Sequence, residues 1–127
     1  MNRQITLGLA MLVGAAIGGV AVQGLHAQAK PPAYYVAELD VTNEDAYNKE
    51  WAPKVSETVK AAGGGYLARG TNITAIEGTA PKRLVVSKFD NIDKLKAWRD
   101  SAAYKSLLPI RDKAVKTVRA YAIEGVN

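Results

Sequence analysis

The order in which two hydrophobic periodicities alternate is the feature that most restricts how this chain can fold. Apolar residues that recur at every second position predict strands, and those that recur every three or four positions predict helices. The periods follow the order strand, helix, strand, strand, helix, strand, with strands expected at 33–41, 66–69, 83–89 and 118–124. This order predicts an α+β fold: a ferredoxin-like βαββαβ sandwich with helices on one face of a four-stranded antiparallel sheet.

The first helix is bounded by residues that prefer helix termini. Thr42 or Asn43 is expected to cap its start, and the glycines at 63–65 are expected to end it. Trp51 belongs to its apolar side and is expected in the core. Pro53 is expected to bend the helix, because proline removes one backbone hydrogen bond.

The second helical segment is expected in two parts. Asn91 caps the first part, which carries Trp98 on its apolar side, and Ser101 restarts a helix that continues to about Lys116. Pro109 lies inside the second part and is expected to bend it by freeing one backbone carbonyl.

The sheet is predicted to have two partly apolar faces, although the helices can cover only one of them. On the first strand, Tyr34 and Val36 lie beside Glu38 on the side that the helices should leave open. The last strand places Tyr121 and Ile123 together on one side. An uncovered apolar face favours association with a second copy, so we expect a homodimer whose sheets pack face to face, a dimeric α+β barrel.

Residues 1–29 have the pattern of an export signal. Arg3 precedes an uncharged, largely apolar run that reaches the small-residue site Ala27-Gln28-Ala29. We expect cleavage there, which leaves residues 30–127 as one 98-residue domain, periplasmic or secreted. The alternative is an uncleaved anchor, because residues 5–22 approach the ~20 apolar residues that a membrane-spanning helix needs.

The residue types left after cleavage exclude several kinds of active site. The only histidine, His26, belongs to the leader, and the chain has no cysteine. The mature domain therefore cannot form a Ser-His-Asp triad, a Cys-His pair, a histidine-ligated haem or an ordinary zinc site, and we expect no cofactor and no metal. Catalysis would have to use Asp, Glu, Lys, Tyr or the substrate itself.

The charge pattern gives no sign of a nucleic-acid partner. The chain carries a formal net charge of +5, which becomes +4 when Arg3 leaves with the leader. Most basic residues alternate with acidic ones, as on a solvated surface, and no basic groove with interleaved aromatic residues is present. After cleavage we expect no membrane partner either.

Several short motifs occur in the order found in a known family. They are Tyr66-Leu67-Ala68-Arg69-Gly70, Glu77-Gly78, Arg83 through Phe89, Ser101 with Tyr104 and Arg111, and Glu124-Gly125. With these motifs, the sequence from Ala33 to Val126 resembles the DUF1330 family of the dimeric α+β barrel superfamily. The resemblance implies the fold and dimerisation, and it implies no reaction, because the family has no assigned function. Related barrels include cofactor-free monooxygenases, isomerases and non-catalytic dimers.

Three residues near the open face of the sheet are candidates for ligand binding. Arg69 precedes a glycine that lets a ligand approach, while Glu38 and Tyr34 belong to the open side of the first strand. We predict that the three supply the polar part of a cavity between the two sheets, lined also by Val36. The alternative is that Arg69 and Glu38 only neutralise each other.

Tyr104 and Arg111 form a second candidate pair. They lie about two helical turns apart and therefore share nearly the same helix face. Either Arg111 holds an anion at the mouth of a cleft, or Tyr104 and the stem of Arg111 cover the sheet edge.

Two functions from different classes follow from these residues. The first is an exported homodimer that binds a small anionic or aromatic molecule in the cavity. The alternative is a cofactor-free oxygenase or isomerase that uses Tyr, Glu and Arg side chains of the same cavity. The lack of histidine and cysteine in the mature domain favours binding.

Overall fold

The computed structural model describes residues 30–126 and contains one four-stranded antiparallel sheet. The leader expected at residues 1–29 lies outside the described residues. The strand order is β2-β3-β1-β4, so the two middle strands are β3 and β1. The strands are β1 (Ala33–Val41), β2 (Gly65–Gly70), β3 (Arg83–Phe89) and β4 (Val115–Glu124). This is the ferredoxin-like arrangement that the periodicities predicted.

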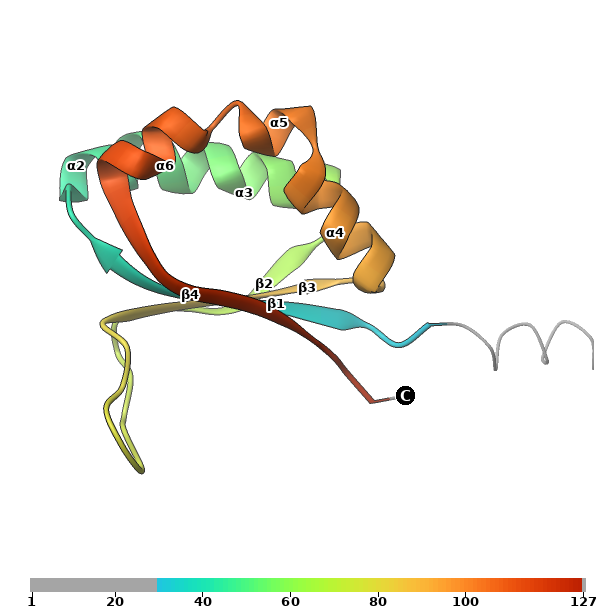
Figure 1. The fold of residues 1–127 in the computed structure, drawn as a ribbon, viewed down its shortest axis with the longest axis horizontal. Coiled ribbons are helices and arrows are strands. Elements are labelled where there is room, and N and C mark those ends of the chain that lie inside the picture. Colours follow the sequence, from blue (N-terminus) through green and yellow to red (C-terminus); the bar gives the residue numbers. More distant parts are fainter. Residues whose placement is uncertain (1–29, 127) are drawn as a thin grey trace, which may run out of the picture.

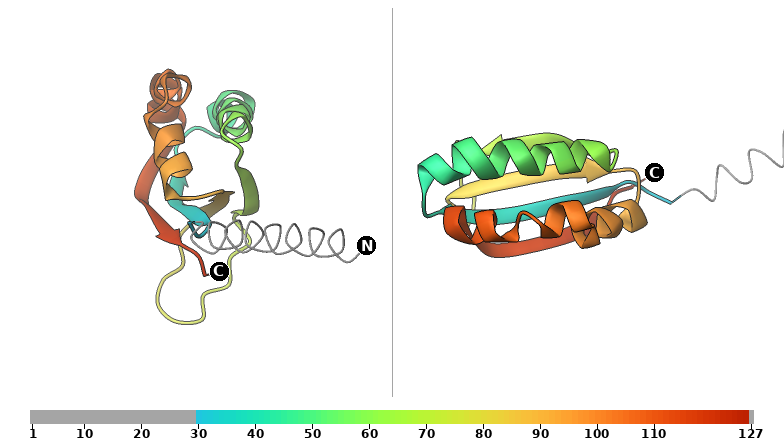
Figure 2. Two further views of the ribbon diagram at one scale, coloured as in Figure 1. Left: turned by 90° about the vertical axis from the view of Figure 1, so that its right-hand side faces the viewer. Right: turned by 90° about the horizontal axis from the view of Figure 1, so that it is seen from above.

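Six helical segments cover one face of this sheet and leave the other face open (Figure 1). Seen from above, they form two rows that run side by side across the sheet (Figure 2). The first row comprises α2 (Glu44–Ala46), η1 (Tyr47–Trp51) and α3 (Ala52–Ala61), and the second comprises α4 (Ile92–Asp100), α5 (Ala102–Lys105) and α6 (Leu108–Ala114). No helix within residues 30–126 is long and apolar enough to cross a membrane.

The core lies between the helices and the inward-facing side of the sheet. Alternate residues of β1, including Ala33, Ala37 and Leu39, are buried there, as the period of two predicted. Trp51 and Trp98 are 6% and 4% exposed, which confirms both as core residues. We call this side the inner face and the opposite side the outer face.

The first helical row contains a π-helix, which the residue pattern did not indicate. Asn43 caps the row by accepting the Ala46 N–H at 3.1 Å. The wider turn spans Tyr47–Trp51 and ends just before Pro53, which lies in the first turn of α3. A missing N–H costs little in a first turn, so a change of helix type accompanies Pro53 instead of the simple bend that we expected.

The second helical row also departs from expectation, because the helix predicted from Ser101 to about Lys116 is wrong. It is split into α5 and α6, and Pro109 lies in the first turn of α6. Proline can start a helix but cannot continue one without losing a hydrogen bond. Strand β4 begins at Val115 instead of Val118, because Val115 pairs with Val41 and extends the ladder with β1.

A register shift in β2 decides which of its side chains face the helices. The pairing with β3 shifts between Tyr66 and Ala68, so that Tyr66 lies opposite Ser87 and Arg69 lies opposite Val85. Regular alternation would have placed Leu67 and Arg69 on the same face. The bulge instead brings Tyr66 and Arg69 together on the inner face, and Leu67 is 58% exposed.

The turn after α3 brings the backbone close to the core, and this contact can be tested. A Cβ on Gly64 would lie 2.7 Å from Cε2 of Phe89, which is 1% exposed, whereas a Cβ on Gly65 would meet nothing within 4 Å. We expect Gly64→Ala to lower the free energy of unfolding by about 1–3 kcal/mol through overpacking. The matched variant Gly65→Ala should leave it unchanged or raise it by up to about 1 kcal/mol. Urea unfolding measures both, and equal destabilisation would contradict the close packing at Gly64.

Candidate functional site

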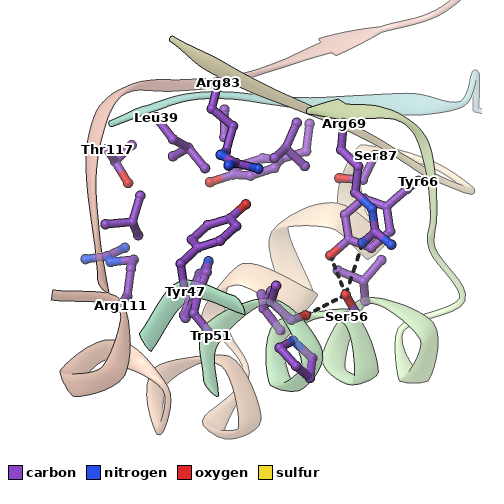
Figure 3. Close-up of a pocket in the computed structure, with 18 of the residues that line it drawn as sticks. Leu39, Tyr47, Trp51, Ser56, Tyr66, Arg69, Arg83, Ser87, Arg111 and Thr117 are labelled. Carbon is purple, nitrogen blue, oxygen red and sulfur yellow. Dashed lines mark hydrogen bonds between the residues drawn. The ribbon is translucent and has the colours of Figure 1, made fainter. Parts of the chain in front are cut away.

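A pocket of about 600 Å³ lies between the inner face of the sheet and the two helical rows (Figure 3). Every strand and five of the six helical segments contribute to it. Its volume falls within the range of small-molecule sites. The lining residues that carry the argument below are Tyr47, Ser56, Tyr66, Arg69, Arg83 and Arg111.

An aromatic cluster forms much of the apolar wall of the pocket. Trp98 packs edge-on against Tyr35 and Tyr104, with ring centroids 5.1 and 5.0 Å apart. Trp51 contacts Tyr104 in the same way at 6.0 Å. The indole N–H of Trp98 donates to Thr58 Oγ1 at 3.0 Å, so its polar group is satisfied. These rings therefore pack closely against one another and form an aromatic wall of the pocket.

Arg69 lies at an exposed edge of the pocket and is held by neighbouring side chains. Its guanidinium stacks over the ring of Tyr66 at 4.4 Å and donates from Nη1 to Ser56 Oγ at 3.3 Å. Ser56 Oγ in turn lies 3.3 Å from the Tyr66 hydroxyl. Arg69, Tyr66 and Ser56 therefore form one polar group on one side of the pocket (Figure 3).

Arg83 extends from β3 toward the π-helix, where its guanidinium lies 4.6 Å from the centre of the Tyr47 ring (Figure 3). Its Nε atom is buried and has no hydrogen-bond partner among the described residues. Burial raises the pKa of the Tyr47 hydroxyl above its ordinary value, and the charge of Arg83 offsets this only in part. Tyr47 is therefore a neutral hydrogen-bond donor at neutral pH, beside a guanidinium that keeps unused donor capacity.

Arg111 lies on the opposite side of the pocket from Arg69 (Figure 3). It donates from Nη1 to the Tyr104 hydroxyl at 3.4 Å and lies 3.5 Å from the exposed carboxylate of Asp112. The two residues that share a helix face in the sequence are thus in contact, although α5 and α6 are separate helices. Burial raises the pKa of Tyr104, so this hydroxyl also keeps its proton at neutral pH.

The charge balance of the pocket is strongly one-sided. Arg69, Arg83 and Arg111 line it, and no aspartate, glutamate or histidine is among its described lining residues. Among these arginines only Arg111 has a salt bridge within residues 30–126, and its partner is largely exposed. A pocket lined by three guanidinium groups attracts an anion.

Arg83 and Tyr47 belong to this site but were not among the residues singled out from the sequence. A signal for Arg83 was present, because it shares the period of two with Val85, Ser87 and Phe89. A charged residue on the buried side of a middle strand needs a partner or a ligand. Tyr47 precedes Trp51 by four residues, which is the spacing of an ordinary apolar helix face, and residue spacing gives no sign of a π-helix.

Glu38 lies on the outer face, away from the pocket and from Arg69. Its carboxylate accepts hydrogen bonds from Arg119 Nη2 at 2.8 Å and from the Tyr121 hydroxyl at 2.9 Å. These hydrogen bonds, that of Arg119 first, lower the pKa of Glu38. The alternative that Arg69 and Glu38 neutralise each other is therefore wrong, because pairing across β1 and β4 gives Glu38 a different arginine.

Tyr34 also lies on the outer face, opposite Ile123 of β4, and it packs against Gly125. Of the five predicted site residues, the structure brings Arg69, Tyr104 and Arg111 into one pocket and leaves Glu38 and Tyr34 outside it. The pocket found here lies on the helix side of the sheet, whereas we had expected a cavity between two sheets lined by Val36. A ligand role for these residues stays a prediction. Within residues 30–126, no group of three His, Cys, Asp or Glu side chains could hold a metal ion.

Solved structures of similar fold are distant in sequence. A protein of unknown function from Rhodopseudomonas palustris is 11% identical with a TM-score of 0.63, over 84% of this chain and 92% of that one. SnoaB, a cofactor-independent oxygenase from Streptomyces nogalater, is 5% identical with a TM-score of 0.56, over 76% and 95%. HapK from Hahella chejuensis is 11% identical with a TM-score of 0.50, over 75% and 93%. At such identities the likeness shows the fold alone.

No curated protein sequence matches the chain. A family model does match, and it extends over residues 32–126, which is nearly the whole of the described domain and includes every strand and helix of the pocket. Its description is "Domain of unknown function". The chain therefore belongs to the DUF1330 family.

Proposed function

We propose that the protein binds a small anionic molecule with an aromatic body in the pocket between the sheet and the helices. The observation that carries this proposal is a lining with three arginines and, among the described residues, no acidic side chain. An anionic ligand would neutralise guanidinium groups that the domain itself leaves uncompensated.

The apolar wall of the pocket determines which uncharged part such a ligand can have. Trp51, Trp98 and Tyr104 present rings to the pocket, and pockets of this volume accept molecules of one to a few rings. A flat aromatic acid can pack against the rings and pair with the arginines. A small inorganic anion would leave the rings without a contact.

The alternative function is that of a cofactor-free oxygenase or isomerase. Such an enzyme needs a group that removes a proton from its substrate. The lining supplies tyrosines whose pKa burial raises at Tyr47 and Tyr104, and such tyrosines hold their protons at neutral pH. They can donate hydrogen bonds to an anion but are poor bases, so binding is the function that this lining supports best.

Both tryptophans of the chain line the pocket, which provides a direct test of binding. We expect 2-naphthoate to change the intrinsic fluorescence and to bind measurably in calorimetric titration. Val85→Phe places a ring in the pocket and should abolish both signals, while its neighbour Val86→Phe, on the outer face, should retain them. Thermal melts show that both variants are folded. No signal from any member of a panel of aromatic acids would contradict the proposal.

We also propose that the protein is a homodimer that associates through the outer face of the sheet. The helices leave this face uncovered (Figure 1), and Leu67, Tyr121 and Ile123 are 58%, 47% and 62% exposed. The charge of Glu38 is already compensated within the chain, so a partner can cover it without leaving a carboxylate unpaired. A second copy fits because two-fold symmetry places the same apolar face on both sides of the interface.

The dimer has its own test at the centre of the outer face. Val36 lies between Val86 and Tyr121 in neighbouring strands. We expect light scattering to give twice the mass of one chain for the wild type and the mass of one chain for Val36→Lys, because a buried unpaired ammonium is costly. The control Ala61→Lys, at an exposed position of α3, should remain dimeric. A monomeric wild type with intact secondary structure would contradict the proposal.

We further propose that residues 1–29 direct export and are removed, so that the protein acts in the periplasm or outside the cell. The support is the charge, apolar run and small-residue site of the sequence. N-terminal sequencing of the exported protein should find Lys30 first, or Gln28 if cleavage follows Leu25-His26-Ala27. Intact Met1 in a membrane fraction would instead establish an uncleaved anchor.

A further inference from the structure

We infer that Arg83 and Tyr47 bind the charged group of the ligand, and that this group is the carboxylate of an aromatic acid. This inference rests on the proposed function, since it assigns the charged end of the same ligand to one part of the pocket. Arg83 belongs to the middle strand β3 and Tyr47 to the π-helix, and the fold brings the two side chains together (Figure 3).

Of the three pocket arginines, Arg83 has the fewest polar partners within the domain. Arg69 donates to Ser56, and Arg111 donates to Tyr104 and lies near Asp112. Arg83 interacts with the ring and the hydroxyl of Tyr47, and its buried Nε has no partner among the described residues. Arg69 is also exposed at the edge of the pocket, where water screens its charge, whereas Arg83 is half-buried. An anion that enters the pocket therefore gains the most binding free energy by contacting Arg83.

Tyr47 adds a second donor at the same place. The residue is 7% exposed, and the π-helix directs its ring into the pocket beneath Arg83 (Figure 3). Burial raises the pKa of its hydroxyl, so the proton remains available for a hydrogen bond. π-Helical turns are frequent at functional sites, and here the wider turn supplies both Tyr47 and Trp51 to the lining.

The geometry of the donors favours a carboxylate over a phosphate. The Nε and one Nη of a guanidinium form two parallel N–H groups that match the two oxygens of a carboxylate. The guanidinium of Arg83 balances a single negative charge, and the neutral hydroxyl of Tyr47 adds one hydrogen bond. A phosphate dianion would need a second cation or backbone N–H groups in contact with it. Leu39 and Tyr47 lie beside Arg83, while Arg69, whose charge also acts on the Tyr47 hydroxyl, is engaged with Ser56 and Tyr66.

The test compares ligands that differ only in the charged group. Calorimetric titration of the purified protein with 2-naphthoate, 2-naphthamide and 2-naphthyl phosphate should give the tightest binding for the carboxylate. Arg83→Gln should weaken 2-naphthoate by about 10- to 100-fold, the usual range for a hydrogen bond to a charged group, and should change 2-naphthamide little. Tyr47→Phe should weaken 2-naphthoate by about 2- to 10-fold.

Two controls isolate the role of Arg83. Lys96→Gln removes one positive charge at an exposed position of α4, away from the pocket, and should leave the preference for the carboxylate intact. Because the domain makes little use of the Arg83 guanidinium, Arg83→Gln should not lower the melting temperature of the ligand-free protein. Loss of binding without loss of stability is what separates a ligand-binding arginine from a structural one.

The possible results have distinct meanings. The preference for the carboxylate could survive Arg83→Gln and disappear in Arg69→Gln or Arg111→Gln. In that case the carboxylate binds elsewhere in the pocket and this inference is wrong, although the proposed function stands. Tighter binding of the phosphate overturns the choice of a carboxylate. If neither these three compounds nor any member of the aromatic-acid panel binds the wild type, both the inference and the proposed function fail.

Discussion

Packing of one aromatic cluster against the inner face of the sheet is the interaction on which the rest of this domain depends. Trp98 contacts Phe89 of β3, Tyr35 of β1 and Tyr104 of α5, so a single side chain joins two middle strands to the second helical row. With no disulfide in a domain of this size, such buried rings supply much of the available stabilisation. Three of these rings, those of Tyr35, Trp98 and Tyr104, also line the pocket.

The pocket occurs where this packing is incomplete. Close to Phe89 the core admits no additional atom, as the backbone at Gly64 shows, while near Arg83 the sheet and the helices leave a cavity. A buried guanidinium nitrogen without a partner costs free energy that a methionine or leucine at the same position would avoid. Sites that bind ligands commonly carry such a cost, because groups reserved for a ligand cannot also be satisfied within the protein.

The two faces of the sheet divide the polar residues into separate roles. On the inner face, arginines lie among aromatic rings without acidic partners in the described lining. On the outer face, Glu38 is fully engaged by Arg119 and Tyr121, and the surrounding residues are largely apolar. A charge that is internally compensated is compatible with burial against another molecule, whereas an uncompensated one is suited to a charged ligand. The same strand β1 therefore contributes to two unrelated surfaces.

By itself the sequence determined the order of elements, a cap at Thr42 or Asn43 and one at Asn91, and the burial of Trp51 and Trp98. These follow from periodicity and local hydrogen bonding, which act over a few residues. The family followed from the resemblance of several motifs in the same order along the chain. Only the tertiary structure decided that Arg69 faces the helices and that Glu38 pairs with Arg119. It also decided that Arg83 meets Tyr47. The reason is physical: strand register, the bulge next to Leu67 and the π-helix before Pro53 result from contacts between segments far apart in the chain, and a shift of one residue exchanges the faces of a strand.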